Sequence, residues 1–585
     1  MRTTAAYAAQ LLLALGLLSS PALCQASNAE GAAAAPNRSA PVQQARYIVQ
    51  GTTISSAHDR VVSAGGKVLQ DLRVINGVSA LLTSPQAQQL SANAALRLFK
   101  DRPLTTSSGN SPLAAKGLKD LLALVFTDGT AITSKGKNYG TNYPMLVGAD
   151  TLQQDGIRGK GVTIAILDSG FWPDASDNVK SRVLGSIDVV NAGSKPALTD
   201  PFGHGTHITS IAAGSFGIAP EANLVLVRAF DANGMGSYTN VIAGLDWIIA
   251  NRQKYKIRVL NLSFGAPPQS NYWDDPLNQA VMTAWRSGIV VVTAAGNEGP
   301  TPMTIGVPGN VPYVITVGAQ TDNYTPFNPL DDRLASFSST GPTLEGFVKP
   351  EVIAPGGHMV ASMWYQSYLA NIDPDSMKKG DSLFTMSGTS QAAAITSGIV
   401  ALMIQSDPTL SPDAVKCRLM ASASPAVTFT GVRAYSVFQQ GAGLVSAIRA
   451  VSNVTSGCAN QGLDIDADLA GTRHFGGPAN QDANGNYYVM NMDGSTWGEA
   501  LSDDGYTWSK GISWNQGSIW SNGYTWSKGY TWSKGYTWSK GYTWSKGYTW
   551  SKGYTWRKAL PWWGTSGTRE VSARPASIAS WVPNQ

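Results

Sequence analysis

The chain has 585 residues, of which 14% are charged, and a formal net charge of +5. This length exceeds that of one ordinary domain and predicts about two to four folding units. The charge is too sparse for the dense basic surface of a nucleic-acid-binding protein, so we exclude that class and expect no nucleic-acid partner.

Residues 1–26 are expected to be a secretory signal peptide. Arg2 precedes an apolar stretch around Leu11–Leu18, and small residues follow it. A membrane-spanning helix needs about 20 apolar residues, so this stretch is too short to span. Cys24 could carry a lipid, but Leu23 stands before it where a small residue would be expected. No later segment is apolar enough to span, and the mature protein is predicted to be secreted and extracellular, soluble or attached to the cell surface.

Two cysteines, Cys417 and Cys458, remain once the signal peptide is removed. Two cysteines in an exported protein can form one disulfide, which is the prediction here. The alternative is two separate buried thiols. Their spacing and the scarcity of nearby histidines argue against zinc.

A small α+β unit is predicted over residues 45–102, after a linker at 27–44 that is rich in Ala, Asn, Pro and Gln. The stretch ARYIVQG alternates like a strand, and GGKVLQDLRVINGVSALLT indicates turn, strand, turn and strand. SPQAQQLSANAALRLFKD indicates a helix followed by a short strand. Residues 103–142 are weakly patterned, and we expect an exposed connection there.

The main domain is predicted over residues 143–458. Its apolar strands, separated by helical stretches, read GVTIAILDSG, NLVLVRAF, IRVLNLSFG, GIVVVTAAGN and YVITVGA. Continuous apolar strands with helical crossovers predict an α/β fold, a parallel sheet covered by helices on both faces. Ligands of such sheets bind at the carboxyl ends of the strands, where Asp168 and Asn297 lie.

The remainder divides into a connecting region at 459–504, a repeat at 505–558 and a tail at 559–585. Tryptophan recurs every six residues in the repeat, mostly as GYTWSK. A helix would scatter these tryptophans, whereas an extended chain places Tyr, Trp and Lys on one face. Short strands are therefore favoured, and a disordered low-complexity tail is the alternative.

Three motifs carry residues that could perform chemistry. Asp168 lies in TIAILDSGFWPD, His204 in PFGHGTHITSIAAG and Ser390 in FTMSGTSQAAAIT. Each has a plain structural interpretation, since Asp favours turns and Ser favours helix N-caps. Taken together, the three motifs resemble those of the subtilisin-like serine peptidases, and their order Asp, His, Ser is the order known for subtilisin.

The resemblance implies a catalytic triad. A serine hydroxyl becomes a nucleophile when an imidazole takes its proton, and His204 would take it and later protonate the leaving amine. Asp168 would orient the imidazole and stabilise its cation. Ser390 at a helix start would have backbone N–H groups near the oxyanion, so the cap and nucleophile interpretations are compatible.

Further site residues follow from the same resemblance. Asn297 in TAAGNEGP resembles the family's oxyanion asparagine. The stretch NLSFG, with Ser263, Phe264 and Gly265, resembles the edge strand that pairs with the substrate main chain and borders the specificity pocket. His207 is interpreted as a helix-face residue that supports the site.

Two residues depart from the family pattern. Gln391 stands where Met is frequent, and Ala394 where Pro is frequent. Neither takes part in the proton chemistry, so they affect fine geometry rather than activity.

The unit at 45–102 resembles the inhibitory propeptide of these peptidases. The chain would then be an autoprocessed zymogen cut between about 102 and 142, and its partners would be protein or peptide substrates and its own propeptide. The chemistry requires no cofactor. Structural calcium enters only by resemblance, and no ligand set can be assigned, so metal residues stay unknown.

Two other classes of protein compete with this prediction. An α/β-hydrolase esterase would need G-x-S-x-G and the order Ser, acid, His, whereas Ala392 stands two residues after Ser390. A degenerate peptidase would act only through its tail. An active peptidase whose Trp and Tyr faces hold it to a cell surface or polysaccharide is a third form, and aromatic faces that simply bury each other are the alternative to it.

Overall fold

The computed structural model describes residues 43–106, 142–173, 179–191, 198–325, 331–378, 382–427, 433–481, 487–489, 512–514, 531–533 and 536–537. The predicted signal peptide, nearly all of the first predicted linker, most of the predicted processing linker and the tail at 559–585 lie outside these residues. Among the described helices, none is both long enough and apolar enough to cross a membrane.

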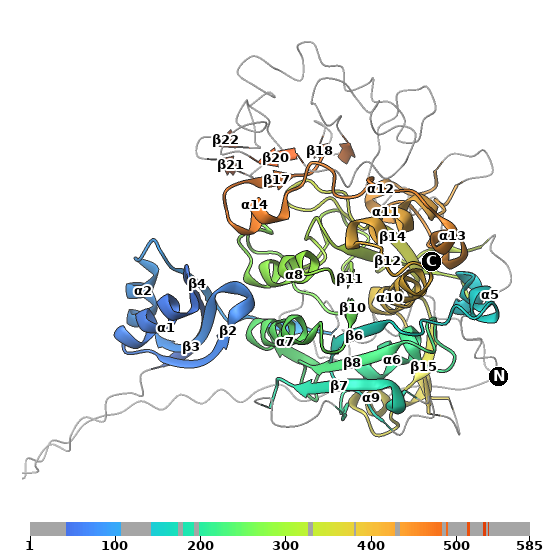
Figure 1. Cartoon of the computed structure of the whole chain (residues 1–585), viewed down its shortest axis with the longest axis horizontal. Helices are drawn as coiled ribbons and strands as arrows, with labels where there is room; N and C mark the ends of the chain where they lie inside the picture. The colour runs from blue at the N-terminus through green and yellow to red at the C-terminus, as the bar shows by residue number, and fades with distance from the viewer. Residues whose placement is uncertain are drawn as a thin grey trace, which may run out of the picture. The chain divides into compact units, whose positions relative to one another are not determined.

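The first described unit is a four-stranded antiparallel sheet with two helices (Figure 1). Its strand order is β2-β3-β1-β4, and it has a hydrophobic core of its own. Its elements are β1 (Gln44–Gln50), α1 (Ile54–Ser63), β2 (Lys67–Leu72), the 3-10 turn η1 (Arg73–Ile75), β3 (Gly77–Thr83), α2 (Ser84–Ser91) and β4 (Arg97–Lys100).

Helix α1 was not predicted. Its N-terminus has a capping box, in which Thr53 Oγ1 accepts from the Ser56 amide at 3.1 Å and the Thr53 amide donates to Ser56 Oγ at 3.2 Å. Reciprocal caps of this kind satisfy two helix-end donors. The pattern T-x-x-S before the buried residues Ala57 and Val61 was therefore the available signal.

The main sheet has eight strands, in the order β13-β12-β11-β10-β6-β8-β7 with β14 beside β12. Every pairing is parallel except that of β12 with the short edge strand β13. The predicted α/β fold is confirmed. The strands are β6 (Thr163–Asp168), β7 (Val183–Asp188), β8 (Asn223–Arg228), β10 (Ile257–Leu262), β11 (Val290–Ala294), β12 (Ile315–Thr321), β13 (Arg333–Leu334) and β14 (Val352–Pro355).

Helices cover both faces of this sheet (Figure 1). One face carries α7 and α8, which pack together, and the other carries α6 and α10, which also pack together. We call them the α7 face and the α6 face. The helices are α6 (His204–Ala213), α7 (Tyr238–Asn251), α8 (Pro276–Arg286) and α10 (Thr389–Ser406).

Side-chain contacts establish that these faces are opposite. Gly244 of α7 lies so close to the sheet that a Cβ there would be 2.9 Å from Leu167. On α10, Ser397 Oγ donates to Asn261 Oδ1 at 2.9 Å. Asn261 is paired in register with Ile166, the neighbour of Leu167. Because successive strand residues point to opposite faces, α7 and α10 lie on different sides of the sheet.

The crossover through α6 has the unusual hand. Helix α6 joins β7 to β8 and α7 joins β8 to β10, so both connections step in the same direction along the sheet. They lie on opposite faces and therefore have opposite hands. Helix α8 also lies on the α7 face, and its connection from β10 to β11 steps in the same direction along the sheet as that of α7. Parallel crossover connections are right-handed in nearly all proteins, so α7 and α8 follow this rule and α6 is the left-handed exception. This exception brings α6 beside α10.

The remaining described elements are mostly short and lie between the larger ones. They are β5 (Pro103–Thr105), α4 (Tyr143–Leu146), α5 (Ala149–Gln154), η2 (Lys180–Arg182), β9 (Met235–Ser237), β15 (Met359–Ser362), α9 (Tyr368–Ile372), η3 (Pro374–Ser376), β16 (Leu383–Met386), α11 (Pro412–Ser422), α12 (Val437–Gln440), α13 (Ala447–Ser452), α14 (Ile465–Leu469), β17 (His474–Gly476), β18 (Ala479–Gln481) and β19 (Tyr487–Val489).

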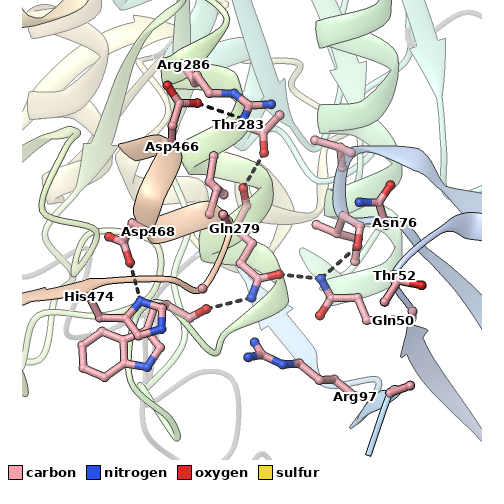
Figure 2. A pocket seen from close by; sticks show the side chains of 18 of the residues that line it. Gln50, Thr52, Asn76, Arg97, Gln279, Thr283, Arg286, Asp466, Asp468 and His474 are labelled. Atoms are coloured by element: carbon pink, nitrogen blue, oxygen red, sulfur yellow. Dashed lines mark hydrogen bonds and ion pairs between the residues drawn. The ribbon is translucent and has the colours of Figure 1, made fainter. Parts of the chain in front are cut away.

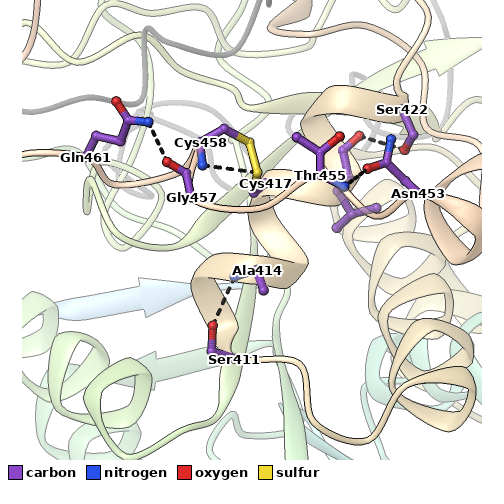
Figure 3. Close-up of a disulfide and its surroundings, with 10 residues drawn as sticks. Ser411, Ala414, Cys417, Ser422, Asn453, Thr455, Gly457, Cys458 and Gln461 are labelled. Carbon is purple, nitrogen blue, oxygen red and sulfur yellow. Dashed lines mark hydrogen bonds between the residues drawn. A yellow bond between two sulfur atoms is a disulfide. The ribbon is translucent and has the colours of Figure 1, made fainter.

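The predicted disulfide is present between Cys417 of α11 and Cys458, whose Cα atoms are 5.2 Å apart (Figure 3). The body does not end at 458 as predicted. Phe475, Tyr487 and Val489 belong to the main hydrophobic core, so the first part of the predicted connecting region packs into the main domain. Burial of these apolar side chains is the reason, because it removes them from water.

Three short strands are described within the repeat: β20 (Ile512–Trp514), β21 (Thr531–Ser533) and β22 (Tyr536–Thr537). Strand β20 pairs with β17, and β21 pairs with β22. Most of the repeat lies outside the described residues, so the choice between strands and disorder stays a prediction.

Candidate active site

Asp168 and His204 meet at the carboxyl end of the sheet. Asp168 is the last residue of β6, and its Oδ1 lies 2.7 Å from His204 Nδ1. The same oxygen accepts from the Ser169 amide at 2.7 Å. Both side chains are buried. A carboxylate on Nδ1 fixes the tautomer and leaves Nε2 as the proton acceptor.

A second acid, Asp200, was not predicted and holds the start of α6. Its Oδ1 accepts from Ser169 Oγ and from the Gly203 amide, both at 2.8 Å. Its Oδ2 accepts from the Thr206 amide and hydroxyl, both at 2.7 Å. Asp200 therefore ties the first turn of α6 to the residue after Asp168. An Asp just before a small-residue helix was the available signal.

Ser390 is the second residue of α10 and does not cap it, contrary to the cap interpretation. The cap position is Gly388. Ser390 Oγ donates to the Ser263 carbonyl at 3.2 Å, and Ser263 Oγ donates to the Ser390 carbonyl at 3.0 Å. The amide of Ser390 lies in the first turn, where N–H groups have no intrahelical acceptor. Its hydroxyl is thus held at the end of β10 rather than used for capping.

Helices α6 and α10 bring the histidine and serine motifs together. His207, one turn along α6 from His204, has Nδ1 3.5 Å from the side-chain nitrogen Nε2 of Gln391, the residue after Ser390. Its Nε2 lies 3.2 Å from the Met359 carbonyl and 3.1 Å from that of Phe384. The interpretation of His207 as a supporting residue agrees with these contacts.

His207 is fully buried, and this burial lowers its pKa to about 3. Its backbone hydrogen bonds oppose that shift, and the neighbouring His204 adds to it. A neutral ring whose Nε2–H donates to the carbonyls of β15 and β16 is therefore built into the site.

Asn297 lies three residues beyond β11 and is oriented by Thr389. Its Oδ1 accepts from both the amide and the hydroxyl of Thr389, each at 3.0 Å. This arrangement directs the amide nitrogen toward Gly388, where a Cβ would lie 3.4 Å from Nδ2. The amide group therefore borders the turn that carries Ser390.

Ser263, Phe264 and Gly265 follow the end of β10. Strand β10 itself is central in the sheet, so the predicted edge can only be formed by the residues beyond it. Phe264 does not open into a pocket. It is buried and packs against Phe230, with ring centroids 5.2 Å apart.

Strand β5 occupies this edge. It pairs antiparallel with β9, and the Gly265 amide donates to the Thr105 carbonyl at 3.3 Å on its other side. The Thr106 amide donates to the Gly234 carbonyl at 3.3 Å, and Leu104 is buried. Residues 103–106, predicted as exposed linker, are instead an inserted strand, because main-chain partners stand on both sides of them.

Polar contacts join the N-terminal unit to the α7 face. Asp246 of α7 accepts from the amides of Arg73 and Val74 at 3.2 and 3.1 Å. Gln50 Nε2 donates to Gln279 Oε1 of α8 at 2.5 Å, beside a cavity of about 580 Å³ that residues of both the N-terminal unit and the peptidase line (Figure 2).

No group of three or more His, Cys, Asp or Glu side chains in the described part of the chain is arranged to hold a metal ion. Calcium remains an expectation from resemblance, and no step below involves a metal.

The chain is similar to known serine proteases over its main domain. The subtilase family model matches residues 159–443. The serine protease AprX of Bacillus subtilis (strain 168) is 41% identical over 273 residues, which are 44% of this chain and 60% of that protein. Subtilisin DY of Bacillus licheniformis is 33% identical over 287 residues, which are 48% of this chain and 89% of that protein.

Among solved structures, fervidolysin from Fervidobacterium pennivorans, a keratinolytic enzyme related to subtilisin, matches with a TM-score of 0.54. Its identity is 20%, and the match covers 77% of this chain and 68% of that chain, so it supports the fold. The chain belongs to the subtilase family of serine endopeptidases. Within that family it spans most of the length of subtilisin DY but less than two thirds of AprX.

Proposed function

We propose that this chain is a secreted serine endopeptidase that hydrolyses peptide bonds through an acyl-enzyme on Ser390 and is made as a self-inhibited zymogen. The observation that carries the proposal is the bond from Asp168 to His204 Nδ1, together with the packing of α6, which begins at His204, against α10, which carries Ser390. The N-terminal signal-like segment supports export. A role of the Trp repeat in surface or polysaccharide binding stays a separate proposal.

The reaction begins at Ser390 Oγ, which leaves the Ser263 carbonyl by rotation about the Cα–Cβ bond. Oγ attacks the scissile carbonyl carbon, and its proton passes to His204 Nε2. The Ser390 amide and the Asn297 side chain donate to the oxyanion. The intermediate expels the amine, which takes the proton from His204, and water then hydrolyses the ester by the same steps in reverse.

The propeptide is assigned to the unit at 45–102, and the pairing of β5 supports the position of the first cut. Thr105 is opposite Gly265 in an antiparallel bridge. Ser263, two residues before Gly265, accepts the Ser390 hydroxyl bond, and Ser107 follows Thr105 by the same two residues along the chain. The bond between Ser107 and Ser108 would then be the one presented to the nucleophile.

Intact-mass measurement of the secreted protein, with and without a serine-directed phosphonyl fluoride, tests this proposal. We expect a single adduct on Ser390 and a wild-type chain that begins at Ser108, while Ser390→Ala stays uncut and unlabelled. A folded, propeptide-free wild type that takes no label would overturn the enzymatic assignment. A protein that is labelled on Ser390 but begins at another residue would overturn only the proposed position of the cut, between Ser107 and Ser108.

Retention of the full chain on cell-envelope material tests the role of the repeat. A chain that ends after residue 489 is the control, because it keeps the packed body. Equal retention of both chains would remove the binding proposal and leave the peptidase assignment intact.

A further inference from the structure

The path of a substrate can be followed from one face of the sheet to the other. Strand β5 lies on the α7 face, because the Tyr238 amide at the start of α7 donates to the Arg102 carbonyl at 3.0 Å. The chain direction from Pro103 to Thr106 leads toward Ser263 and Ser390. The residues before the scissile bond therefore bind on the α7 face, and those after it continue to the α6 face.

A hairpin stands on the α6 face where the leaving-group half arrives. Strands β15 and β16 pair antiparallel, and β16 ends at Met386, four residues before Ser390. Two of their carbonyls contact His207. The hairpin is thus attached to the helix that carries the catalytic base and leads into the helix that carries the nucleophile.

The connection between β15 and β16 is held against the segment before His204. The amides of Tyr368 and Leu369 donate to the carbonyls of Pro201 and Phe202 at 2.8 and 3.1 Å. At Gly203, φ is +107°, and a Cβ would lie 2.2 Å from Met363 Sδ. This close approach places the residue after Met363 beside the first turn of α6.

Two tryptophans stack at that place. Trp364 follows Met363, and Trp172 lies four residues after Asp168, with its amide donating to Thr206 Oγ1 at 2.9 Å. Their ring centroids are 6.3 Å apart, with planes 24° from parallel. Both are partly exposed, and the next residue, Tyr365, is 60% exposed. Aromatic surface that is partly exposed near the first turn of α6, which begins at His204, is available to a ligand.

We infer that Trp172, Trp364 and Tyr365 form an aromatic subsite for the leaving-group half of the substrate. It takes an apolar side chain, aromatic or leucine-like, within the first three residues after the scissile bond. This subsite rests on the proposed function. Through it, the enzyme selects among protein substrates by the residues that follow the scissile bond. Indole faces bind such side chains by apolar burial, whereas they offer nothing to Gly or Asp.

Two substrate series test the subsite on the mature enzyme. One is a peptide methyl ester, whose leaving group is too small to reach the tryptophans. The other is a set of quenched peptides with the same acyl half and Phe, Leu, Ala, Gly or Asp at each of the three positions after the scissile bond. We expect wild type to favour Phe or Leu over Gly at one position by about tenfold in kcat/KM.

Trp364→Ala should abolish this preference and leave ester hydrolysis unchanged, while Trp364→Phe should keep most of it. Trp247→Ala is the matched control, because Trp247 packs on Tyr255 within the α7 face, with ring centroids 5.9 Å apart. If Trp364→Ala keeps the wild-type preference for Phe or Leu over Gly, the subsite is overturned. It is also overturned if the substitution lowers kcat/KM for the methyl ester as much as it lowers kcat/KM for the peptides. If wild type fails to cleave the ester, the proposed function fails instead.

If Trp364→Ala does not fold, Trp172→Ala provides the same comparison from the other side of the stack. Its backbone bond to Thr206 is retained, because the amide makes it.

Discussion

The two faces of the central sheet are built differently. On the α6 face, buried hydrogen bonds hold the candidate catalytic side chains, as Asp200 accepts three from the start of α6 and one from Ser169. On the α7 face, the N-terminal unit is held by bonds such as those from Asp246 to two main-chain amides, at a partly exposed border. The α6 face is therefore fixed by buried hydrogen bonds, whereas the N-terminal unit is held at a border that solvent reaches in part.

The largest expected effect comes from breaking the network on the α6 face. Asp200→Asn replaces an acceptor oxygen with an NH₂ group that faces existing donors, so we expect a loss of about 3 to 5 kcal/mol in the free energy of unfolding. Urea unfolding in a Ser390→Ala background measures it without self-digestion.

The control for Asp200→Asn is Asp231→Asn, in a turn near β9 where Asp231 accepts from the Asn233 and Met235 amides. We expect it to cost less than about 1 kcal/mol. Equal losses at the two positions would contradict the difference between the faces.

Asn297→Leu tests whether the Asn297 side chain, on the catalytic side of the molecule, donates a hydrogen bond to the oxyanion. It removes a donor without removing the nucleophile, so kcat for the ester should fall by about 10²–10³ while KM changes little. That magnitude was measured for the corresponding donor in subtilisin, a member of this family, and is not an independent derivation. A raised KM with an unchanged kcat would show instead that Asn297 binds the substrate equally well in the ground state and the transition state.

His207 makes the α6 face sensitive to acid. Its pKa is lowered to about 3 in the folded protein, from the ordinary value of 6.5. Between pH 3 and pH 6.5 the unfolded state therefore binds a proton at His207 and the folded state does not. Stability therefore rises with pH across this window and is lost as pH falls through it. At pH 5 the loss relative to pH 8 is about 2 kcal/mol.

His207→Gln, again in the Ser390→Ala background, should remove this part of the pH dependence. His58→Gln in α1 is the control, because its side chain is 47% exposed. An unchanged pH profile in His207→Gln would show that another group causes the acid loss.

The smallest effect is expected on the α7 face. Asp246→Asn weakens two bonds to the amides of Arg73 and Val74, so propeptide affinity should fall by about tenfold. The measurement is the lag before activity appears in freshly processed enzyme, which should shorten. Asp155→Asn, at an exposed position after α5, should leave the lag unchanged. An unchanged lag in Asp246→Asn would remove this contact from inhibition.

Local patterns predicted much of the fold and supplied the motifs of the candidate site. The apolar runs ending at Asp168 and before Asn297 are continuous in sequence, and so are the motifs around His204 and Ser390. The missed helix α1 also had a local signal in its capping box. These features depend on residues a few positions apart.

What could not be predicted depends on contacts between distant segments. The strand at 103–106 looks like linker until β9 and Gly265 stand beside it. The bond from Ser390 to Ser263 spans 127 positions, and the stack of Trp172 on Trp364 requires the left-handed crossover that places α6 beside α10. Sequence periodicity contains no information on such pairings.

The disulfide between Cys417 and Cys458 has a consequence for an enzyme surrounded by copies of itself. A nick anywhere in the chain between these cysteines leaves the two fragments covalently joined. The segment after Cys458 also contributes Phe475 and Tyr487 to the core, so such a nick would not shed it. The repeat would therefore stay attached to the catalytic body after the enzyme cuts another copy of itself between these cysteines.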